Sequence, residues 1–291
     1  MAELGKINPK VLALTADLGG STRLTEFAKQ FPDRYFNVGV AEANMVGIAT
    51  GLALEGFIPF CTSFAVFVPG RCFDQIRVSV CQNGANVKLV GSHYGLTNPG
   101  DGATAQSVED ITLMRVLPEM TVICPADAIE TKKAVMAMAE NSGPMYLRIS
   151  RAETEVVTGG EALFEIGKAT ILRTGKKVTI IACGTMVPVA LQAAEKIDGE
   201  VINLSTIKPL DGETILESVK KTKRVVTIEE HSIYGGMGSA VAEFLSQEYP
   251  VPIKIVGIRD VFGQSARSYE ELLEKYGLTE ENIIRSFESL K

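Results

Sequence analysis

The chain of 291 residues contains no tryptophan, only two histidines and no pair of cysteines spaced as CxxC. A disulfide framework or a thiolate metal site therefore has no support in the sequence, and we expect reduced cysteines in the core. The five cysteines are Cys61, Cys72, Cys81, Cys124 and Cys183. No uninterrupted apolar run reaches the ~18 residues of a membrane-spanning helix. The first residues also lack the apolar stretch of a secretory signal, so we expect a cytoplasmic protein.

The chain has no excess of positive charge. Its formal net charge is −6 and its pI is near 5.2, and no block of lysine and arginine occurs. We therefore expect neither a nucleic acid nor a membrane surface as a partner. The mean hydropathy of +0.15 is high for a chain with 22% charged residues. Either a large core or an interface that buries apolar surface would explain this value.

Two glycine-rich turns fall short of a dinucleotide-binding loop. The turn DLGGS at 17–21 lacks the pattern GxGxxG, which disfavours a Rossmann dehydrogenase. The stretch GGMG at 235–238 follows a predicted strand but lacks the complete pattern and the acidic residue that should end the next strand. We interpret this second stretch as the tight start of a helix.

Strand-like and helix-like segments alternate along most of the chain, which predicts an α/β fold with a mainly parallel, doubly wound sheet. The first part has predicted strands at 11–16, 35–38, 57–62, 86–91, 120–124 and 145–150. The second part has predicted strands at 177–182, 200–204, 224–229 and 253–257, and a last helix near 280–290. Asp127 with Glu130, and Ser107 with Asp110, predict two capped helix starts.

The alternation breaks in residues 152–176, where charged residues, the sequence TGG at 158–160 and a short strand-like segment at 167–172 occur. Glycine-rich and charged stretches of this kind are typical of linkers. We therefore expect a first domain at 1–155, a linker at 156–176 and a second, smaller α/β domain at 177–291. At this length, both domains can have a real core.

Glu42 is the only charged residue between Arg34 and Glu55. The run at 40–54 is small or apolar nearly all the way round, which predicts a helix buried on every side. A carboxylate taken out of water must find a strong partner or stay protonated, so Glu42 is a candidate for proton chemistry. The alternative is a structural role, in which the carboxylate caps backbone N–H groups at the start of the helix.

Several motifs occur in an order that is more specific than any one of them. They are TADLGGST at 15–22, RYFNVGVAEANMVGIATGLALEGFIPF at 34–60, FAVF at 64–67, GSHYG at 91–95, GDGAT at 100–104, ISR at 149–151, TIKPLD at 206–211 and EEHS at 229–232. This set resembles the C-terminal half of the transketolase group of thiamine-diphosphate enzymes. The resemblance covers essentially the whole chain and implies a pyrimidine-binding domain followed by a transketolase C-terminal domain.

The resemblance implies a cofactor role for residues of the first domain. In these enzymes a glutamate hydrogen-bonds N1′ of the aminopyrimidine and promotes the imino form that removes the thiazolium C2 proton, and Glu42 matches this glutamate. Phe67 would stack on the pyrimidine ring, with Phe64 nearby and with Asp17 and Leu18 close to the cofactor. For either phenylalanine, ordinary core packing is the alternative.

The resemblance also implies residues that bind the substrate. His93 and Asp101 match the family's pair that contacts sugar hydroxyls, and His93 is also a candidate catalytic residue. Ser21 and Arg151 match its phosphate-contacting serine and arginine. A guanidinium can bind phosphate bidentately, and a helix N-terminus favours anions. The alternatives are a turn aspartate, a helix-capping serine, a surface arginine and a hydrogen-bonded loop histidine.

The chain lacks half of a thiamine-diphosphate site. The sequence GDG at 100–102 is similar to the start of the family's metal and diphosphate motif, but no asparagine follows it up to Glu140. We therefore expect no metal ligand here, and a partner chain that supplies the diphosphate-binding domain and the Mg²⁺ ligands. Because the family builds its site across a dimer, we expect a heterotetramer with two copies of each chain, in which the two copies of this chain form a homodimer contact.

The expected function is the transfer of a two-carbon ketol unit between phosphorylated sugars, with thiamine diphosphate as the cofactor. Many family members have a histidine where this chain has Ala105, which leaves the usual donor specificity open. The alternatives are a deoxyxylulose-phosphate synthase fragment, a 2-oxoacid dehydrogenase β subunit, or a non-catalytic paralogue that regulates the partner. The polar set of Ser21, His93, Asp101 and Arg151 suits a phosphosugar better than a small oxoacid.

Overall fold

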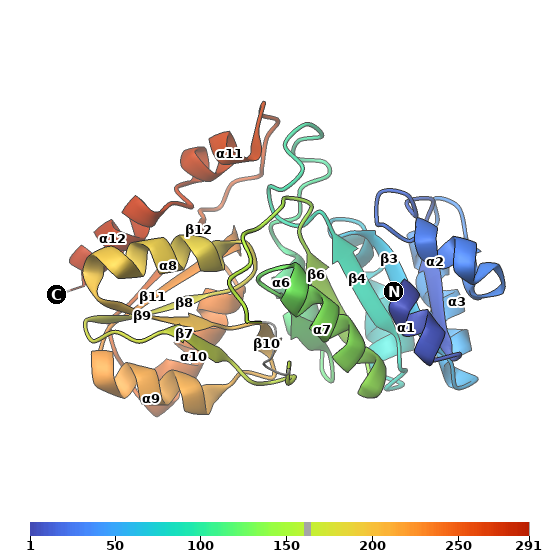
Figure 1. The fold of residues 1–291 in the computed structure, drawn as a ribbon, viewed down its shortest axis with the longest axis horizontal. Helices are drawn as coiled ribbons and strands as arrows, with labels where there is room; N and C mark the ends of the chain where they lie inside the picture. The colour runs from blue at the N-terminus through green and yellow to red at the C-terminus, as the bar shows by residue number, and fades with distance from the viewer. Residues whose placement is uncertain (160–163, 291) are drawn as a thin grey trace.

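The computed structural model describes residues 1–159 and 164–290. The chain forms two α/β halves that lie side by side, each with its own sheet (Figure 1). In the part of the chain that the structure describes, no helix is long and apolar enough to cross a membrane. All five cysteines are buried and free, as the sequence predicts.

The first half contains a seven-stranded sheet. Its strands are β1 (Val11–Thr15), β2 (Tyr35–Asn37), β3 (Ile58–Phe64), β4 (Lys88–Ser92), β5 (Thr121–Ile123), β6 (Met145–Ile149) and β10 (Thr206–Lys208). They lie in the order β10-β5-β6-β4-β3-β1-β2. All neighbours are parallel except β10, which pairs antiparallel with β5. Because β10 comes from the second half of the sequence, this sheet joins the two halves.

Helices cover both faces of this sheet. They are α1 (Ala2–Ile7), α2 (Thr25–Gln30), η1 (Pro32–Arg34), α3 (Glu42–Leu54), α4 (Val68–Arg71), α5 (Phe73–Gln75), the π-helical turn η2 (Ile76–Cys81), α6 (Asp110–Arg115) and α7 (Ala128–Glu140). Alternate residues of a strand point to opposite faces. In β1, Val11 and Ala13 pack with α1, α2 and α7, whereas Leu12 and Leu14 pack with α3, η2 and α6. Burial on both faces explains why the strands are almost uninterrupted apolar runs.

The second half contains a five-stranded sheet in the order β12-β11-β8-β9-β7. The strands are β7 (Thr170–Arg173), β8 (Val178–Ala182), β9 (Gly199–Asn203), β11 (Val225–Ser232) and β12 (Ile253–Ile258). Only β7 runs antiparallel to its neighbour. The helices are α8 (Met186–Ile197), α9 (Gly212–Thr222), α10 (Met237–Glu248), α11 (Tyr269–Tyr276) and α12 (Glu280–Glu288).

The predicted α/β fold and its mainly parallel sheet are confirmed, and the predicted strands agree with the observed ones to within a few residues. The Asp127 cap is also confirmed, since its side chain accepts a hydrogen bond from the Glu130 N–H. The second predicted cap is wrong. Helix α6 begins at Asp110 after Glu109, without a side-chain cap, because the Asp110 carboxylate binds Arg148 instead. Gly160, which belongs to the predicted linker, lies outside the described residues.

The prediction that the helix of Glu42 is buried on every side is wrong for the single chain. One face of α3 packs against the sheet, with Met45, Val46 and Ala49 fully buried. The opposite face lies in solvent, where Ile48 is 37% exposed and Leu54 is 66% exposed. An apolar outer face of this kind is unusual on a monomer and indicates a contact surface.

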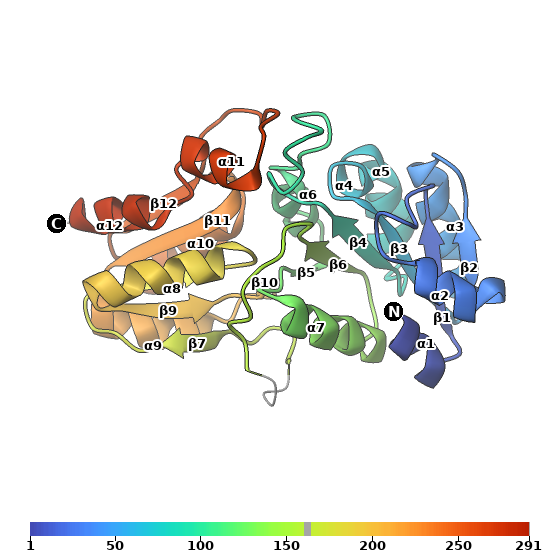
Figure 2. The same ribbon diagram turned by 45° about the horizontal axis from the view of Figure 1, so that its top comes forward.

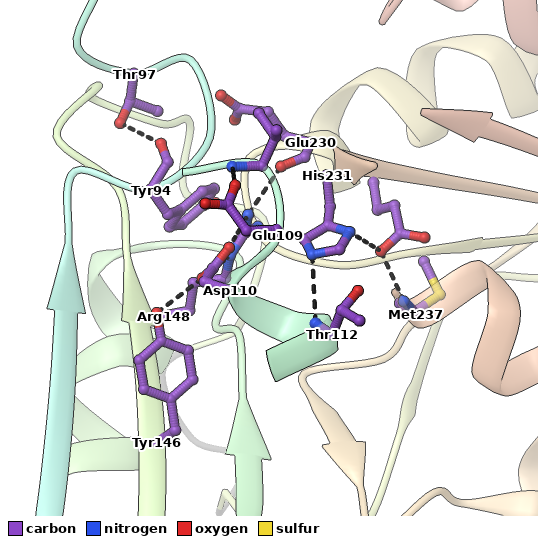
Figure 3. Close-up of polar contacts among 12 residues, drawn as sticks. Tyr94, Thr97, Glu109, Asp110, Thr112, Tyr146, Arg148, Glu230, His231 and Met237 are labelled. Carbon is purple, nitrogen blue, oxygen red and sulfur yellow. Dashed lines mark hydrogen bonds and ion pairs between the residues drawn. The ribbon is translucent and has the colours of Figure 1, made fainter. Parts of the chain in front are cut away.

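A buried polar network holds the two halves together (Figure 3). Arg148 on β6 donates two hydrogen bonds to Asp110, at 2.7 and 2.9 Å, and a third to the main-chain oxygen of Glu230 on β11 at 2.9 Å. The Glu230 carboxylate accepts hydrogen bonds from Thr185 at 2.7 Å and from Tyr269 at 2.6 Å. Burial raises the pKa of Glu230 despite these donors. The network fixes β6, α6 and β11 relative to one another.

Candidate active site

A cleft of about 540 Å³ opens at the carboxyl ends of β1, β3, β4 and β6. Five of the residues predicted from sequence line it: Ser21, Phe64, His93, Asp101 and Arg151. Phe64 ends β3, and the others lie in the segments that follow β1, β4 and β6. The carboxyl ends of parallel strands meet at one edge of a sheet, where ligands of open α/β folds bind. This topology explains why distant motifs share one cleft.

His93 is held by both its backbone and its ring. It follows β4 directly, and its backbone has a φ of 62°, in the left-handed region. Its ring stacks on Phe64 with centroids 4.2 Å apart, and its Nδ1 lies 2.6 Å from Ser92 Oγ. Left-handed backbone in a residue other than glycine is costly and is concentrated at functional sites.

Burial, and after it the nearby Arg151 cation, lowers the pKa of His93 to about 4, and Asp101 opposes this effect. The imidazole is therefore neutral at pH 7. A neutral imidazole has one donor and one acceptor nitrogen, so it can bind a hydroxyl group in either sense and can accept a proton.

Asn98 joins Asp101 to Arg151 and was missed by the sequence interpretation. Its Nδ2 donates to Asp101 Oδ2 at 2.5 Å, and its Oδ1 accepts from Arg151 Nη1 at 2.5 Å. Asn98 is fully buried and also lines the cleft. The available signal was a polar side chain in the loop between two candidate residues, although asparagine is common in loops for purely conformational reasons.

Ser21 and Arg23 lie in the turn after β1, on the wall of the cleft. Helix α2 begins only at Thr25, after Leu24, so Ser21 is not at a helix N-terminus. The expectation that a helix N-terminus adds to anion binding at Ser21 is therefore not met. Arg23, which the sequence interpretation missed, brings a second guanidinium to the same cleft as Arg151.

Asp17 and Leu18 lie in the loop that follows β1. The backbone of Asp17 is left-handed, with a φ of 61°, and its carboxylate and N–H both bond to the Asn37 side chain at 3.0 Å. The Leu18 N–H donates to Thr15 Oγ1 at 3.3 Å. Neither residue lines the cleft. Ala105 is buried at the base of the Asp101 loop and does not line the cleft either.

The Glu42 carboxylate has a partner that the sequence did not indicate. Arg71 Nη1 lies 3.0 Å from Glu42 Oε1, and the two side chains are 52% and 6% exposed, respectively. The Arg71 guanidinium also covers the ring of Phe67 at 4.0 Å, and this ring stacks on Phe64 at 5.7 Å. Because Phe64 in turn stacks on His93, a continuous chain of contacts links Glu42 to the cleft.

Among residues 1–159 and 164–290, no group of three or more histidine, cysteine, aspartate or glutamate side chains could hold a metal ion. The cleft itself combines a neutral histidine, a carboxylate, two guanidiniums and an aromatic wall. This combination suits a polyhydroxylated molecule with an anionic end group.

Comparison with known families gives two matches that together span most of the chain. The model for "Transketolase, pyrimidine binding domain" matches residues 1–156, and the model for "Transketolase, C-terminal domain" matches residues 167–283. The chain is similar to a transketolase C-terminal section of Methanocaldococcus jannaschii, with 47% identity over 98% of this chain and 92% of the relative.

Two further relatives are named for particular sugar substrates. A 6-deoxy-6-sulfo-D-fructose transketolase subunit of Clostridium sp. is 43% identical over 98% of this chain and 90% of the relative. An apulose-4-phosphate transketolase subunit of Phocaeicola vulgatus is 38% identical over 98% of this chain and 93% of the relative.

Solved structures agree with these matches. A split-gene transketolase, described as an inactive β4 tetramer, superposes with a TM-score of 0.90 at 46% identity over 99% of this chain and 94% of that one. A transketolase from Leishmania mexicana superposes with a TM-score of 0.83 at 25% identity, over 99% of this chain but 44% of that one. The chain therefore belongs to the transketolase family, of which it carries the pyrimidine-binding and C-terminal domains.

Proposed function

We propose that this chain is the C-terminal subunit of a split transketolase that moves a two-carbon ketol unit from a phosphorylated ketose to an aldose. One observation carries the proposal. Ser21, Phe64, His93, Asp101 and Arg151 come from distant motifs and line one cleft. Packing of a hydrophobic core would not bring this set of polar side chains together around an open cleft.

In this reading each residue of the cleft has a separate task. Arg151 binds the phosphate, because a guanidinium pairs with phosphate oxygens through two parallel hydrogen bonds. Asp101 accepts hydrogen bonds from sugar hydroxyl groups. His93 is neutral at pH 7, since its pKa is lowered to about 4, and it binds a hydroxyl or carbonyl oxygen or takes up a proton during the reaction. Phe64 orients the imidazole by stacking on it.

The residues around Glu42 fit the aminopyrimidine of thiamine diphosphate. A carboxyl group that is 6% exposed stands beside two stacked aromatic rings, of which Phe67 is covered by a half-exposed cation rather than by core atoms. Thiamine diphosphate supplies the electron sink for cleavage of the carbon–carbon bond. Glu42 would hold a proton toward the aminopyrimidine, and Phe67 would face its ring once Arg71 has moved away. Mg²⁺ and its ligands would belong to the partner subunit.

The test is reconstitution with a partner chain that carries the diphosphate-binding domain. The isolated chain should bind thiamine diphosphate and Mg²⁺ weakly in calorimetry and show no ketol transfer, and the mixture should be active. Micromolar affinity or transfer by the chain alone would overturn the split-subunit proposal. Two relatives are named for a sulfonated and for a phosphorylated sugar, so the donors tested should include both anions.

A further inference from the structure

Asn98 occupies an unusual position between two opposite charges. Its carboxamide donates to Asp101 Oδ2 and accepts from Arg151 Nη1, each at 2.5 Å. A carboxylate can only accept hydrogen bonds and a guanidinium can only donate them. The orientation of the carboxamide is therefore fixed by its two neighbours.

The backbone around Asn98 is held by the second half of the chain. The main-chain oxygen of Asn98 accepts from Gln106 Nε2 at 3.3 Å, and the same Nε2 donates to the Gln264 oxygen at 3.0 Å. The Pro99 oxygen accepts from the Ala266 N–H at 3.0 Å. The loop that carries Asp101 and the segment after β12 lie side by side in both ribbon views (Figures 1 and 2). The backbone that carries the Asn98 side chain is thus held by residues that do not line the cleft.

The Asn98 amide between Asp101 and Arg151 changes how these two groups can bind a substrate. An arginine and a carboxylate that touch directly form a strong charge-assisted pair, in which each satisfies the other. A substrate would then have to break that pair before it could bind either group. With an amide between them, each group uses part of its hydrogen-bonding capacity and keeps the rest for a ligand.

We propose that Asn98 is a positioning residue, which holds Asp101 and Arg151 apart so that both remain available to a phosphorylated polyhydroxylated substrate. This inference rests on the proposed function of the cleft. It adds a residue that keeps the hydroxyl-binding and phosphate-binding groups separate. It also gives the C-terminal domain a role in holding the loop that carries Asn98 and Asp101.

The first test uses Asn98→Leu in the reconstituted complex, with Asn141→Leu as the matched control. Asn141 is exposed at the end of α7, and its side chain donates a local hydrogen bond to the Ala137 oxygen. Asn98→Leu should raise KM for a phosphorylated acceptor about tenfold, with kcat within about threefold of the wild type and KM for glycolaldehyde unchanged. The control should leave all three values unchanged. A merely structural role would instead lower kcat for both acceptors together.

The second test needs neither partner nor activity. The chain has two histidines, so NMR of the imidazole resonances follows His93 directly, and the His231 resonances report on the fold. The charged residues that line the cleft with His93 are Arg23, Asp101 and Arg151. Arg151 lowers the pKa of His93 more than Asp101 raises it. When Asn98→Leu lets these two charges pair, the pKa of His93 should rise from about 4 by about 0.5 or more.

Asn98→Asp gives a contrasting variant, since the new carboxylate still pairs with Arg151 but repels Asp101. It should raise the pKa of His93 at least as far as Asn98→Leu does. An unchanged pKa in Asn98→Leu, with the His231 resonances intact and the expected rise in Asn98→Asp, would overturn the inference. If the wild-type complex proves inactive, the proposed function fails, whereas the NMR result still decides whether Asn98 separates the two charges.

Discussion

The Glu42 carboxylate is buried, but it is paired with a side chain that can leave. Arg71 is 52% exposed, so water can solvate its guanidinium when it moves, whereas Glu42 is 6% exposed and would then need a proton or another partner. The guanidinium covers both the carboxylate and the face of Phe67. Movement of one long side chain would therefore uncover the two groups that the proposed function assigns to the cofactor.

We predict that Glu42→Gln in the reconstituted complex loses most of the activity and keeps the fold. The amide is nearly isosteric with the carboxyl group but cannot transfer a proton. Steady-state kinetics and circular dichroism measure the two properties. Glu55→Gln, on an exposed residue at the other end of α3, is the control and should be fully active. A kcat for Glu42→Gln within about threefold of the wild type would reduce Glu42 to a structural residue.

Arg151 should distinguish phosphorylated from non-phosphorylated substrates. A charge-assisted contact to phosphate contributes about 1.5 to 3 kcal/mol, so Arg151→Ala should lower kcat/KM for phosphosugars about tenfold or more. The value for glycolaldehyde should stay nearly unchanged, because this acceptor has no phosphate. Parallel assays with both acceptors measure the difference. An equal loss for both would assign Arg151 to the fold or to an interface.

At the scale of whole elements, the buried pair of Asp110 and Arg148 joins α6 to β6 and, through Glu230, to β11. Burial alone would raise the pKa of Asp110, but the Arg148 charge and hydrogen bonds hold that pKa below its usual value. The pair therefore stabilises the fold above the unfolded-state pKa, which is about 3.9. This contribution is lost as the pH falls through the lower, folded-state pKa.

We predict that Asp110→Asn lowers the free energy of unfolding at pH 7 by about 3 to 5 kcal/mol, because it leaves the Arg148 charge buried without a counterion. Urea unfolding at pH 7 measures the loss. The variant should also lose the part of the acid sensitivity that Asp110 contributes. Glu271→Gln is the control, since its pair with Arg267 is exposed and should contribute less than about 1 kcal/mol. Equal effects of the two substitutions would contradict the prediction.

The strands could be predicted from sequence because burial on both faces leaves continuous apolar runs bounded by turn residues. Strand β10 could not, since it has three residues and its pairing with β5 joins distant parts of the chain. The same limit applies within the site. The pairs Glu42–Arg71 and Asn98–Arg151 are separated by 29 and 53 positions, and no local pattern indicates such contacts. The motifs themselves could be found because their order along the chain resembles that of the transketolase group.

At the scale of the whole molecule, the outer face of α3 carries apolar side chains that no residue of 1–159 or 164–290 covers. Ile48 and Leu54 are exposed there, and Val40 just before the helix is 75% exposed. Gly47 and Gly51 lie on the same exposed part of the helix and have no neighbouring atoms within 4 Å of an added Cβ. Small residues allow a second backbone to approach closely. The same helix begins with Glu42, so a chain that packs on it lies next to the proposed cofactor groups.

We predict that copies of the chain associate through the exposed apolar face of α3. Light scattering on the isolated chain should give at least twice its 31.3 kDa mass, and mixing with the diphosphate-binding subunit should give a complex with two copies of each chain. Ile48→Asp places a charge in the middle of the apolar face and should produce monomers, because an unpaired buried charge opposes association. Lys254→Asp, an exposed residue on β12 in the other half of the molecule, is the control and should leave the mass unchanged. A wild-type chain that is strictly monomeric, and fully active in a one-to-one complex, would show that the α3 face serves neither contact.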